Sequence, residues 1–125
     1  MARKLYNHVD VRVRDRARAV AFYDQVLGAM GLERRPPGEA FQTYHVPGDE
    51  SQWFGFTVDA AMTAGDTRIC FEASSRDEVE RLAEAARRAG AANLEPAHEA
   101  YGSDYYATFF EDPDGNKLEV AFISA

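Results

Sequence analysis

The sequence predicts an α+β fold in which a β-α-β-β-β unit occurs twice, in residues 1–60 and 66–125 of a single domain. Three observations support this prediction: a strictly alternating strand opens the chain, a capped helical pattern follows the first strand of each half, and an aromatic hairpin ends the sequence. A chain of 125 residues has the usual length of one domain with a substantial hydrophobic core.

The first half is predicted to contain a strand, a helix and three further strands. These elements cover residues 7–14, 16–30, 32–35, 41–46 and 52–58. In the first strand, valines alternate with polar residues such as His8. Asp15 is the expected N-cap of the helix, and Gly28 or Gly31 is expected to end it. The buried stripe of this helix is expected to contain Val20, Tyr23, Val26, Leu27 and Met30.

The second half repeats this order. A strand over residues 67–73, a helix, a strand over 93–97, a loop over 98–104 and a hairpin over 105–122 are predicted in turn. Ser75 and Glu78 form a capping box at the start of the helix, and Gly90 ends it. Its expected buried stripe contains Val79, Leu82, Ala83 and Ala86. Pro113 and Gly115 supply the backbone conformations that the hairpin turn needs.

The composition limits the classes of partner. A formal net charge of −7 argues against nucleic acid and anionic membranes, and it favours a cationic or neutral small ligand. The arginines at positions 12, 14, 16 and 18 lie near acidic residues, so we expect them to form a solvated rim. The lone cysteine, Cys70, and the absence of an apolar leader or membrane span predict a cytoplasmic protein.

Two polar residues stand in strands that are otherwise apolar on one face. Glu119 interrupts the apolar run of the last strand, and His8 lies on the polar face of the first strand. A carboxylate in that setting either points to water, or is buried and compensated by a cation, a metal or hydrogen-bond donors. The face that carries His8 either points to water or lines a polar cavity.

The segments Ala-Phe-Tyr-Asp-Gln-Val-Leu-Gly at 21–28 and Asp-Pro-Asp-Gly-Asn-Lys-Leu-Glu at 112–119 carry a family resemblance, together with the histidine of the opening strand. In this order they resemble the vicinal oxygen chelate superfamily, which contains glyoxalases, bleomycin-resistance proteins, extradiol dioxygenases and fosfomycin-resistance proteins. The resemblance covers nearly the whole chain. It implies mixed sheets that curl round a cavity, a small-molecule ligand and a homodimer.

The internal repeat indicates which residues would meet in such a cavity. Aligning the two halves at their helix caps places His8 over Arg68, and aligning their last strands places Gly55 over Glu119. If a pseudo-twofold axis relates the halves, the four positions converge on one point. The resemblance implies that these positions hold one divalent ion, Zn, Ni, Mn, Fe or Co, with His8 and Glu119 as metal ligands and Glu119 as the catalytic residue.

Arg68 departs from the family pattern, because such members usually have a histidine at this position. Arginine stays protonated and cannot bind a metal, and two ligands are too few for a tight site. One hypothesis is a metal-free cavity, in which Arg68 forms a bidentate ion pair with Glu119 and His8 completes the network. In the other, Arg68 faces outward and a third ligand is recruited. Its candidates are His45, His98 and Asp10.

Five residues are candidates for contact with a ligand. They are Asp10, Trp53, Arg68, Tyr105 and Phe109. Tyr105 and Phe109 share one strand face, so they can line a cavity together, although such aromatic residues are more often core. His98 is either a lid residue or ordinary surface. Cys70 shares the face of Arg68, where a small buried apolar role is more usual than a nucleophilic one.

Three functions are consistent with these observations. The first is a metal-free binding protein of the bleomycin-resistance type, for which acidic charge and aromatic residues suit a cationic, planar ligand. The second is a metal-dependent lyase, isomerase or group transferase that acts on a small oxygenated substrate. The third is an extradiol dioxygenase, against which Arg68 argues. No glycine-rich phosphate loop and no G-x-S-x-G motif occurs, so nucleotide chemistry and serine hydrolysis are not expected.

Overall fold

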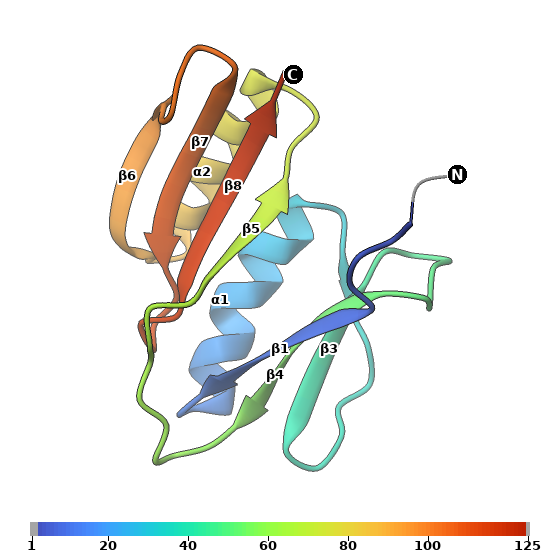
Figure 1. Ribbon diagram of the computed structural model, residues 1–125. Coiled ribbons are helices and arrows are strands. Elements are labelled where there is room, and N and C mark those ends of the chain that lie inside the picture. Colours follow the sequence, from blue (N-terminus) through green and yellow to red (C-terminus); the bar gives the residue numbers. More distant parts are fainter. Residues whose placement is uncertain (1–2, 125) are drawn as a thin grey trace.

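The computed structural model describes residues 3–124 and contains the same series of elements twice (Figure 1). The first series is β1 (His8–Val13), α1 (Arg16–Ala29), β2 (Glu33–Arg34), β3 (Phe41–His45) and β4 (Trp53–Val58). The second is β5 (Arg68–Glu72), α2 (Arg76–Arg88), β6 (Ala92–Glu99), β7 (Tyr105–Glu111) and β8 (Lys117–Ile123). The predicted α+β architecture is therefore confirmed.

Each series forms one mixed, four-stranded sheet. The strand orders are β1-β4-β3-β2 and β5-β8-β7-β6, so the two repeats have the same topology. The first and last strands of each repeat pair in parallel, whereas β3 pairs with β4, and β7 with β8, antiparallel. A helix packs behind each sheet in Figure 1, and the opposite face, called the outer face below, carries none. No helix within residues 3–124 is long and apolar enough to cross a membrane.

The strand register supports the alignment of the two halves. In the first sheet Asp10 lies opposite Gly55, and in the second sheet Cys70 lies opposite Glu119. Asp10 and Cys70 hold the same place in their strands, so Gly55 is the counterpart of Glu119. Positions 55 and 119, far apart in the sequence, are thereby set at equivalent points of two sheets.

Side-chain caps fix the start of both helices. Asp15 accepts a hydrogen bond from the backbone of Arg18 at 2.9 Å, and Ser75 accepts one from the backbone of Glu78 at 3.1 Å. The Glu78 carboxylate returns to the amide of Ser74 at 2.9 Å rather than to that of Ser75, so the expected capping box is shifted by one residue. The helix α1 ends at Ala29, and the left-handed residue after it is Gly31, with φ of +88°.

The buried face of α1 is wider than its periodicity predicted. The α2 stripe agrees with the sequence prediction, but α1 also buries Ala19 and Phe22, while Val20 and Met30 lie at its margin. The cause is contact with the second repeat, where the Phe22 and Phe110 ring centroids lie 6.5 Å apart. One core therefore spans both repeats.

The turn between β7 and β8 joins the repeats by polar contacts. Its Asp114 carboxylate, whose side chain is fully buried, lies 3.2 Å from a nitrogen of Arg14 and 2.7 Å from one of Arg18. These two arginines are thus not a purely solvated rim, as their neighbouring acidic residues suggested. Their side chains are only half exposed, and they compensate a buried charge.

The strand β6 is longer than predicted. It runs from Ala92 to Glu99, and His98 lies opposite Ala107 of β7. The prediction that His98 belongs to a loop is therefore wrong. Two register shifts let this strand pass Pro96 and continue, a feature that residue preferences alone do not signal.

Candidate functional site

The candidate site residues fall into two groups on the two outer faces. His8, Asp10 and Trp53 lie on the first sheet, with Gly55 between them. A cavity of about 280 Å³ opens there and is lined by these four residues, together with Phe41, Gln42, Thr43, Phe56 and Thr57. Arg68, Tyr105, Phe109 and Glu119 lie on the second sheet. No hydrogen bond or ion pair joins His8 to Glu119 within residues 3–124.

Glu119 is the most buried acidic side chain of the second outer face, with 4% of its surface exposed. The Tyr105 hydroxyl donates a hydrogen bond of 2.5 Å to Glu119 Oε2. In the strand register, Glu119 lies between Cys70 and Phe109. Phe109 also forms a small apolar cluster with Ala107 on this face. Glu119 therefore does not point to water, even though no helix covers it.

Tyr105 serves as a hydrogen-bond donor to this carboxylate. Its hydrogen bond to Glu119, followed by partial desolvation and the negative charge, raises the pKa of the Tyr105 hydroxyl above its usual value of 10. The hydroxyl therefore keeps its proton throughout the physiological range. It stabilises the carboxylate with a neutral donor and leaves its charge uncompensated.

Cys70 faces solvent, in contrast to the buried apolar role expected from its place in a strand. Partial desolvation, together with the charge of the neighbouring Glu119, raises the pKa of the Cys70 thiol to about 12. A thiol in this state is a poor nucleophile near neutral pH.

Arg68 does not form the expected ion pair with Glu119, and no carboxylate in the described part of the chain lies within ion-pairing distance of it. Its guanidinium carbon lies 4.9 Å from the centroid of the Phe109 ring, so it makes a cation–π contact. The register explains the difference. Arg68 lies opposite Lys117, two residues before the position opposite Glu119.

His8 stacks on Trp53 at the edge of the first outer face. The ring centroids are 4.3 Å apart and the planes differ by 5°. His8 Nδ1 lies 2.8 Å from the side-chain oxygen of Asn7, which only accepts hydrogen bonds, so Nδ1 carries the proton. The lone pair of His8 Nε2 is then available to a ligand.

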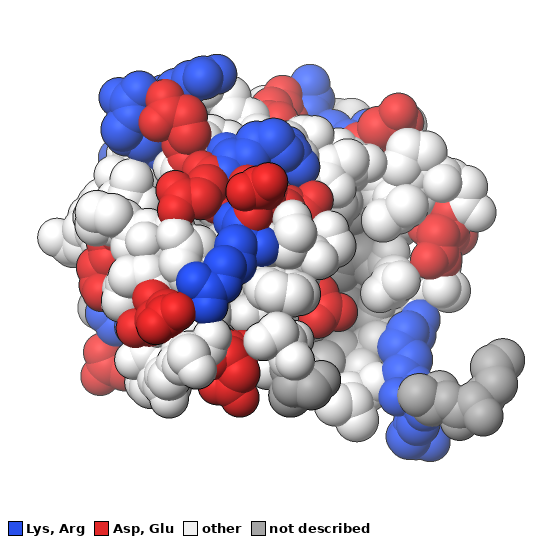
Figure 2. Space-filling model, turned by 90° about the horizontal axis from the view of Figure 1, so that it is seen from above, with Lys and Arg blue, Asp and Glu red and all other residues white. Residues whose placement is uncertain are grey.

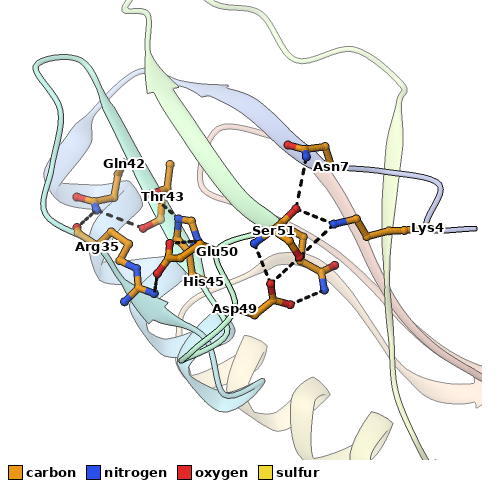
Figure 3. A network of polar contacts seen from close by, with 10 residues as sticks. Lys4, Asn7, Arg35, Gln42, Thr43, His45, Asp49, Glu50 and Ser51 are labelled. Carbon is orange, nitrogen blue, oxygen red and sulfur yellow. Dashed lines mark hydrogen bonds and ion pairs between the residues drawn. The ribbon is translucent and has the colours of Figure 1, made fainter.

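His45 stacks on Trp53 as well, with 5.5 Å between the ring centroids. Figure 3 shows His45 beside Thr43 and Glu50, while Arg35 reaches the same Glu50 carboxylate. His45 Nδ1 is 3.2 Å from Glu50, and Nε2 is 3.2 Å from the Thr43 hydroxyl. Nε2 therefore has a hydrogen-bond partner, whereas the buried Nδ1 has the nearby Glu50 carboxylate but no hydrogen bond within residues 3–124. Lys4 and Asn7 in the same figure instead hold the loop at Ser51.

The residues of one chain do not fit a tight metal site. Of the four repeat-related positions only His8 and Glu119 have ligand chemistry, and no group of three His, Cys, Asp or Glu side chains within residues 3–124 is close enough to hold an ion. Each proposed third ligand has a partner of its own. Asp10 accepts from Thr57 at 2.8 Å, His45 lies between Glu50 and Thr43, and His98 Nδ1 lies 2.7 Å from the Pro96 carbonyl.

Sequence reasoning missed one aromatic residue of the second outer face. Tyr101 is 74% exposed, and its ring stands edge-on to Tyr105, 4.9 Å between centroids, and to Phe109, at 6.4 Å. It lies in the segment between β6 and β7, where no periodicity assigns a face. The sequence offers only one indication of its role: a tyrosine next to Gly102, in a turn that precedes an aromatic strand.

Comparison with known proteins identifies the family. The model of the Glyoxalase/Bleomycin resistance protein/Dioxygenase superfamily matches residues 5–120. This chain belongs to that superfamily. An uncharacterized protein of Pseudomonas aeruginosa strain PAO1 is 32% identical to this chain, over 92% of this chain and 86% of the relative. The resemblance inferred from the two end segments and the opening histidine is therefore confirmed.

Solved structures of the superfamily share the fold. A glyoxalase/bleomycin resistance protein from Albidiferax ferrireducens has a TM-score of 0.81 and 25% identity, over 94% of this chain and 98% of that one. A fosfomycin resistance protein from Mesorhizobium loti has a TM-score of 0.70 and 18% identity, over 98% and 93% of the two chains. At the latter identity the likeness concerns the fold alone.

Proposed function

We propose that this superfamily member binds a small, planar, cationic molecule at Glu119, without a resident metal ion. The observation that carries the proposal is a carboxylate with 4% exposure whose hydrogen-bond donor, Tyr105, is neutral. A buried charge without an opposite charge is costly, and a cationic group on a ligand supplies the missing compensation.

The surroundings of Glu119 suit a flat cation. The Arg68 guanidinium over Phe109 marks a place where a planar cation already rests on a ring. Tyr101 stands edge-on beside the same ring and adds an aromatic wall. The net charge of −7 draws cations toward the protein as a whole.

Calorimetry with benzamidine, a planar aromatic cation, tests this proposal. We expect binding to the unmodified protein and at least tenfold weaker binding to Glu119→Gln, which keeps the size of the side chain and removes its charge. Asp66→Asn removes the same charge from a fully exposed position of the same repeat and is expected to leave binding unchanged. Equal affinity for the unmodified protein and Glu119→Gln contradicts the proposal.

A second candidate function is a metal-dependent lyase, isomerase or transferase. It is favoured by the free Nε2 lone pair of His8 and the buried carboxylate of Glu119. Imidazole and carboxylate are both common metal ligands, and here they lie on two sheets of the same topology. Metal analysis of protein purified without chelator separates the two functions. Stoichiometric metal that is lost in Glu119→Ala supports this enzyme, and benzamidine binding by metal-free protein supports the binding function. A dioxygenase is less favoured, because Arg68 occupies the place of a third ligand.

A homodimer is part of the proposal. His8 and Glu119 lie on separate sheets, so a second copy that covers one outer face with the other would bring them together. Large apolar side chains remain exposed on these faces, among them Phe41 at 48% and Ile123 at 50%. Sedimentation velocity is expected to give a dimer at micromolar concentration, and a monomer at every concentration refutes this part.

We place the protein in the cytoplasm, where the single thiol of Cys70 stays reduced.

A further inference from the structure

A continuous groove separates the two sheets. β1 and β5 are the edge strands that line it, and no hydrogen bond pairs one with the other in the described part of the chain. Two cavities, of about 410 and 790 Å³, share Tyr6, Val9, Ile69 and Cys70 in their linings and so adjoin one another along these strands. In Figure 2 the surface is hollowed between the two repeats, with mostly uncharged atoms around the hollow.

The β1 edge presents unpaired backbone groups to this groove. The carbonyl groups of Asn7 and Val13 bond to the backbone of the β4 side. Alternate residues of a strand turn their backbone groups to opposite sides, so His8, Asp10 and Arg12 turn theirs to the groove. The Arg12 carbonyl confirms this direction, because the side-chain amide of Asn116, in the second repeat, donates a hydrogen bond of 2.8 Å to it.

The β5 edge does the same from the other side. The amide of Ala73 bonds to the carbonyl of Ala121 on β8 at 2.8 Å. By the same alternation, Arg68, Cys70 and Glu72 turn their backbone groups to the groove. Apart from the Arg12 carbonyl, which Asn116 already binds, two rows of backbone groups without a partner in the described part of the chain thus face one another. Such edges are templates for an added strand.

Apolar side chains line the middle of β5 and charged ones its ends, and Asp10 and Lys117 also line the cavity that contains Arg68. Val9, Ile69 and Phe71 are half-buried walls. Arg68 and Glu72 stand at the two ends of β5, and neither forms an ion pair with a described residue. Glu72 lies four positions after Arg68 in the strand, or roughly 13 Å at about 3.3 Å per residue.

We propose that this groove binds an extended peptide of about four to five residues with apolar side chains. The C-terminal carboxylate of the peptide lies at Arg68 and its N-terminal amino group at Glu72. Because β5 runs from Arg68 to Glu72, the peptide runs antiparallel to β5. The arrows of β1 and β5 point in opposite directions in Figure 1, so the same peptide runs parallel to β1. The charge at each end selects free termini and fixes this direction.

The peptide Ala-Val-Thr-Val-Ala with free termini is the probe. We expect it to bind in calorimetry and to shift the backbone amide NMR signals of β1 and β5 more than those of β3. Ala-Val-Pro-Val-Ala lacks the central amide donor and should bind at least tenfold more weakly. The acetylated and amidated form of the first peptide should lose a similar factor, because it lacks both terminal charges.

Variants assign the ends of the peptide. Arg68→Ala and Glu72→Gln are expected to weaken the free-ended peptide at least threefold each and to leave the capped peptide unchanged. Arg87→Ala is the matched control, because this exposed arginine lies on α2 and does not line the groove. Glu119→Gln leaves peptide binding unaltered, so failure of the small-ligand proposal does not affect this one.

Three outcomes overturn the inference. Equal binding of the proline-containing and parent peptides removes the role of the strand edges. Equal binding of free-ended and capped peptides removes the assigned direction. Absence of peptide binding at millimolar concentration, whether the protein sediments as a monomer or as a dimer that covers these edges, removes the site itself.

Discussion

The Tyr23 hydroxyl donates a hydrogen bond of 2.6 Å to the Asp112 carboxylate, 89 positions away in the sequence. Both residues are at most 1% exposed. Tyr23 belongs to α1 of the first repeat, and Asp112 begins the turn between β7 and β8 of the second. Burial, together with the charge of Asp112, raises the pKa of Tyr23 well above 10, so this donor never loses its proton under ordinary conditions. The bond fixes how the two repeats dock.

Tyr23→Phe is therefore expected to destabilise the protein. It removes one donor from a buried carboxylate with little change in volume, and we expect a loss of about 1.5–3 kcal/mol in the free energy of unfolding. Urea denaturation followed by circular dichroism measures this loss. The control is Tyr106→Phe, whose hydroxyl donates to the exposed Glu80, and it should cost within about 0.5 kcal/mol. Equal effects of both substitutions contradict the docking role.

Gly55 cannot carry a side chain without a shift of the sheet. A Cβ added there would lie 2.7 Å from the backbone oxygen of Gln42 on the neighbouring strand. Gly55→Ala is thus expected to lower the free energy of unfolding by about 1–3 kcal/mol. Gly28→Ala is the matched control: nothing lies within 4 Å of its Cβ position in α1, and it should raise stability by about 0.5–1 kcal/mol. Thermal unfolding of both variants distinguishes the effects, and a neutral Gly55→Ala contradicts the clash.

This restriction also bears on the site. Gly55 is the counterpart of Glu119, so the first repeat cannot offer a carboxylate where the second does. The two outer faces are consequently different in chemistry although their strands are equivalent. The first has a histidine–tryptophan stack beside a bare backbone, and the second has a buried acid.

Local signals were sufficient for most of the fold. The caps Asp15 and Ser75, together with the hairpin turn that contains Gly115, depend on neighbours in sequence, and each was predicted within about a residue of its place. The extra buried residues of α1, such as Phe22, were not predictable in this way. They face the second repeat, and a helical period does not record what packs on its flank.

The candidate site depended on information that one strand does not contain. The sequence left open whether Glu119 is solvated or buried, and its burial results from Tyr105 and Phe109 on the adjacent strand. The expected pairing of Arg68 with Glu119 failed for a similar reason. The pairing register between β5 and β8 decides which residues are neighbours. The hydrophobic pattern of a strand shows which face a residue lies on, but it does not show which residue of the next strand lies opposite.

Asp49 gives a pH-dependent contribution to the loop before β4. Hydrogen bonds from the side chain of Ser51, followed by those from its backbone and from Gln52, lower the pKa of Asp49 from 3.8 to about 2. Because the folded pKa is below the unfolded one, this stabilisation is complete above about pH 4 and is lost as the pH falls toward 2. In Ser51→Ala, NMR titration of the Asp49 carboxyl carbon should give a pKa closer to 3.8. An unchanged titration refutes the assigned cause.

Trp53 offers a direct test of the stack on the first outer face. It is the single tryptophan of the chain, so its fluorescence has no other source. His8→Ala removes the ring that lies 4.3 Å from the indole, and we expect a shift of the emission maximum to longer wavelength and stronger quenching by acrylamide. His98→Ala removes an imidazole that contacts Phe109 on the other sheet and should leave the spectrum unchanged. If His8→Ala also leaves the spectrum unchanged, the indole is not shielded by His8 and the stack is not present in solution.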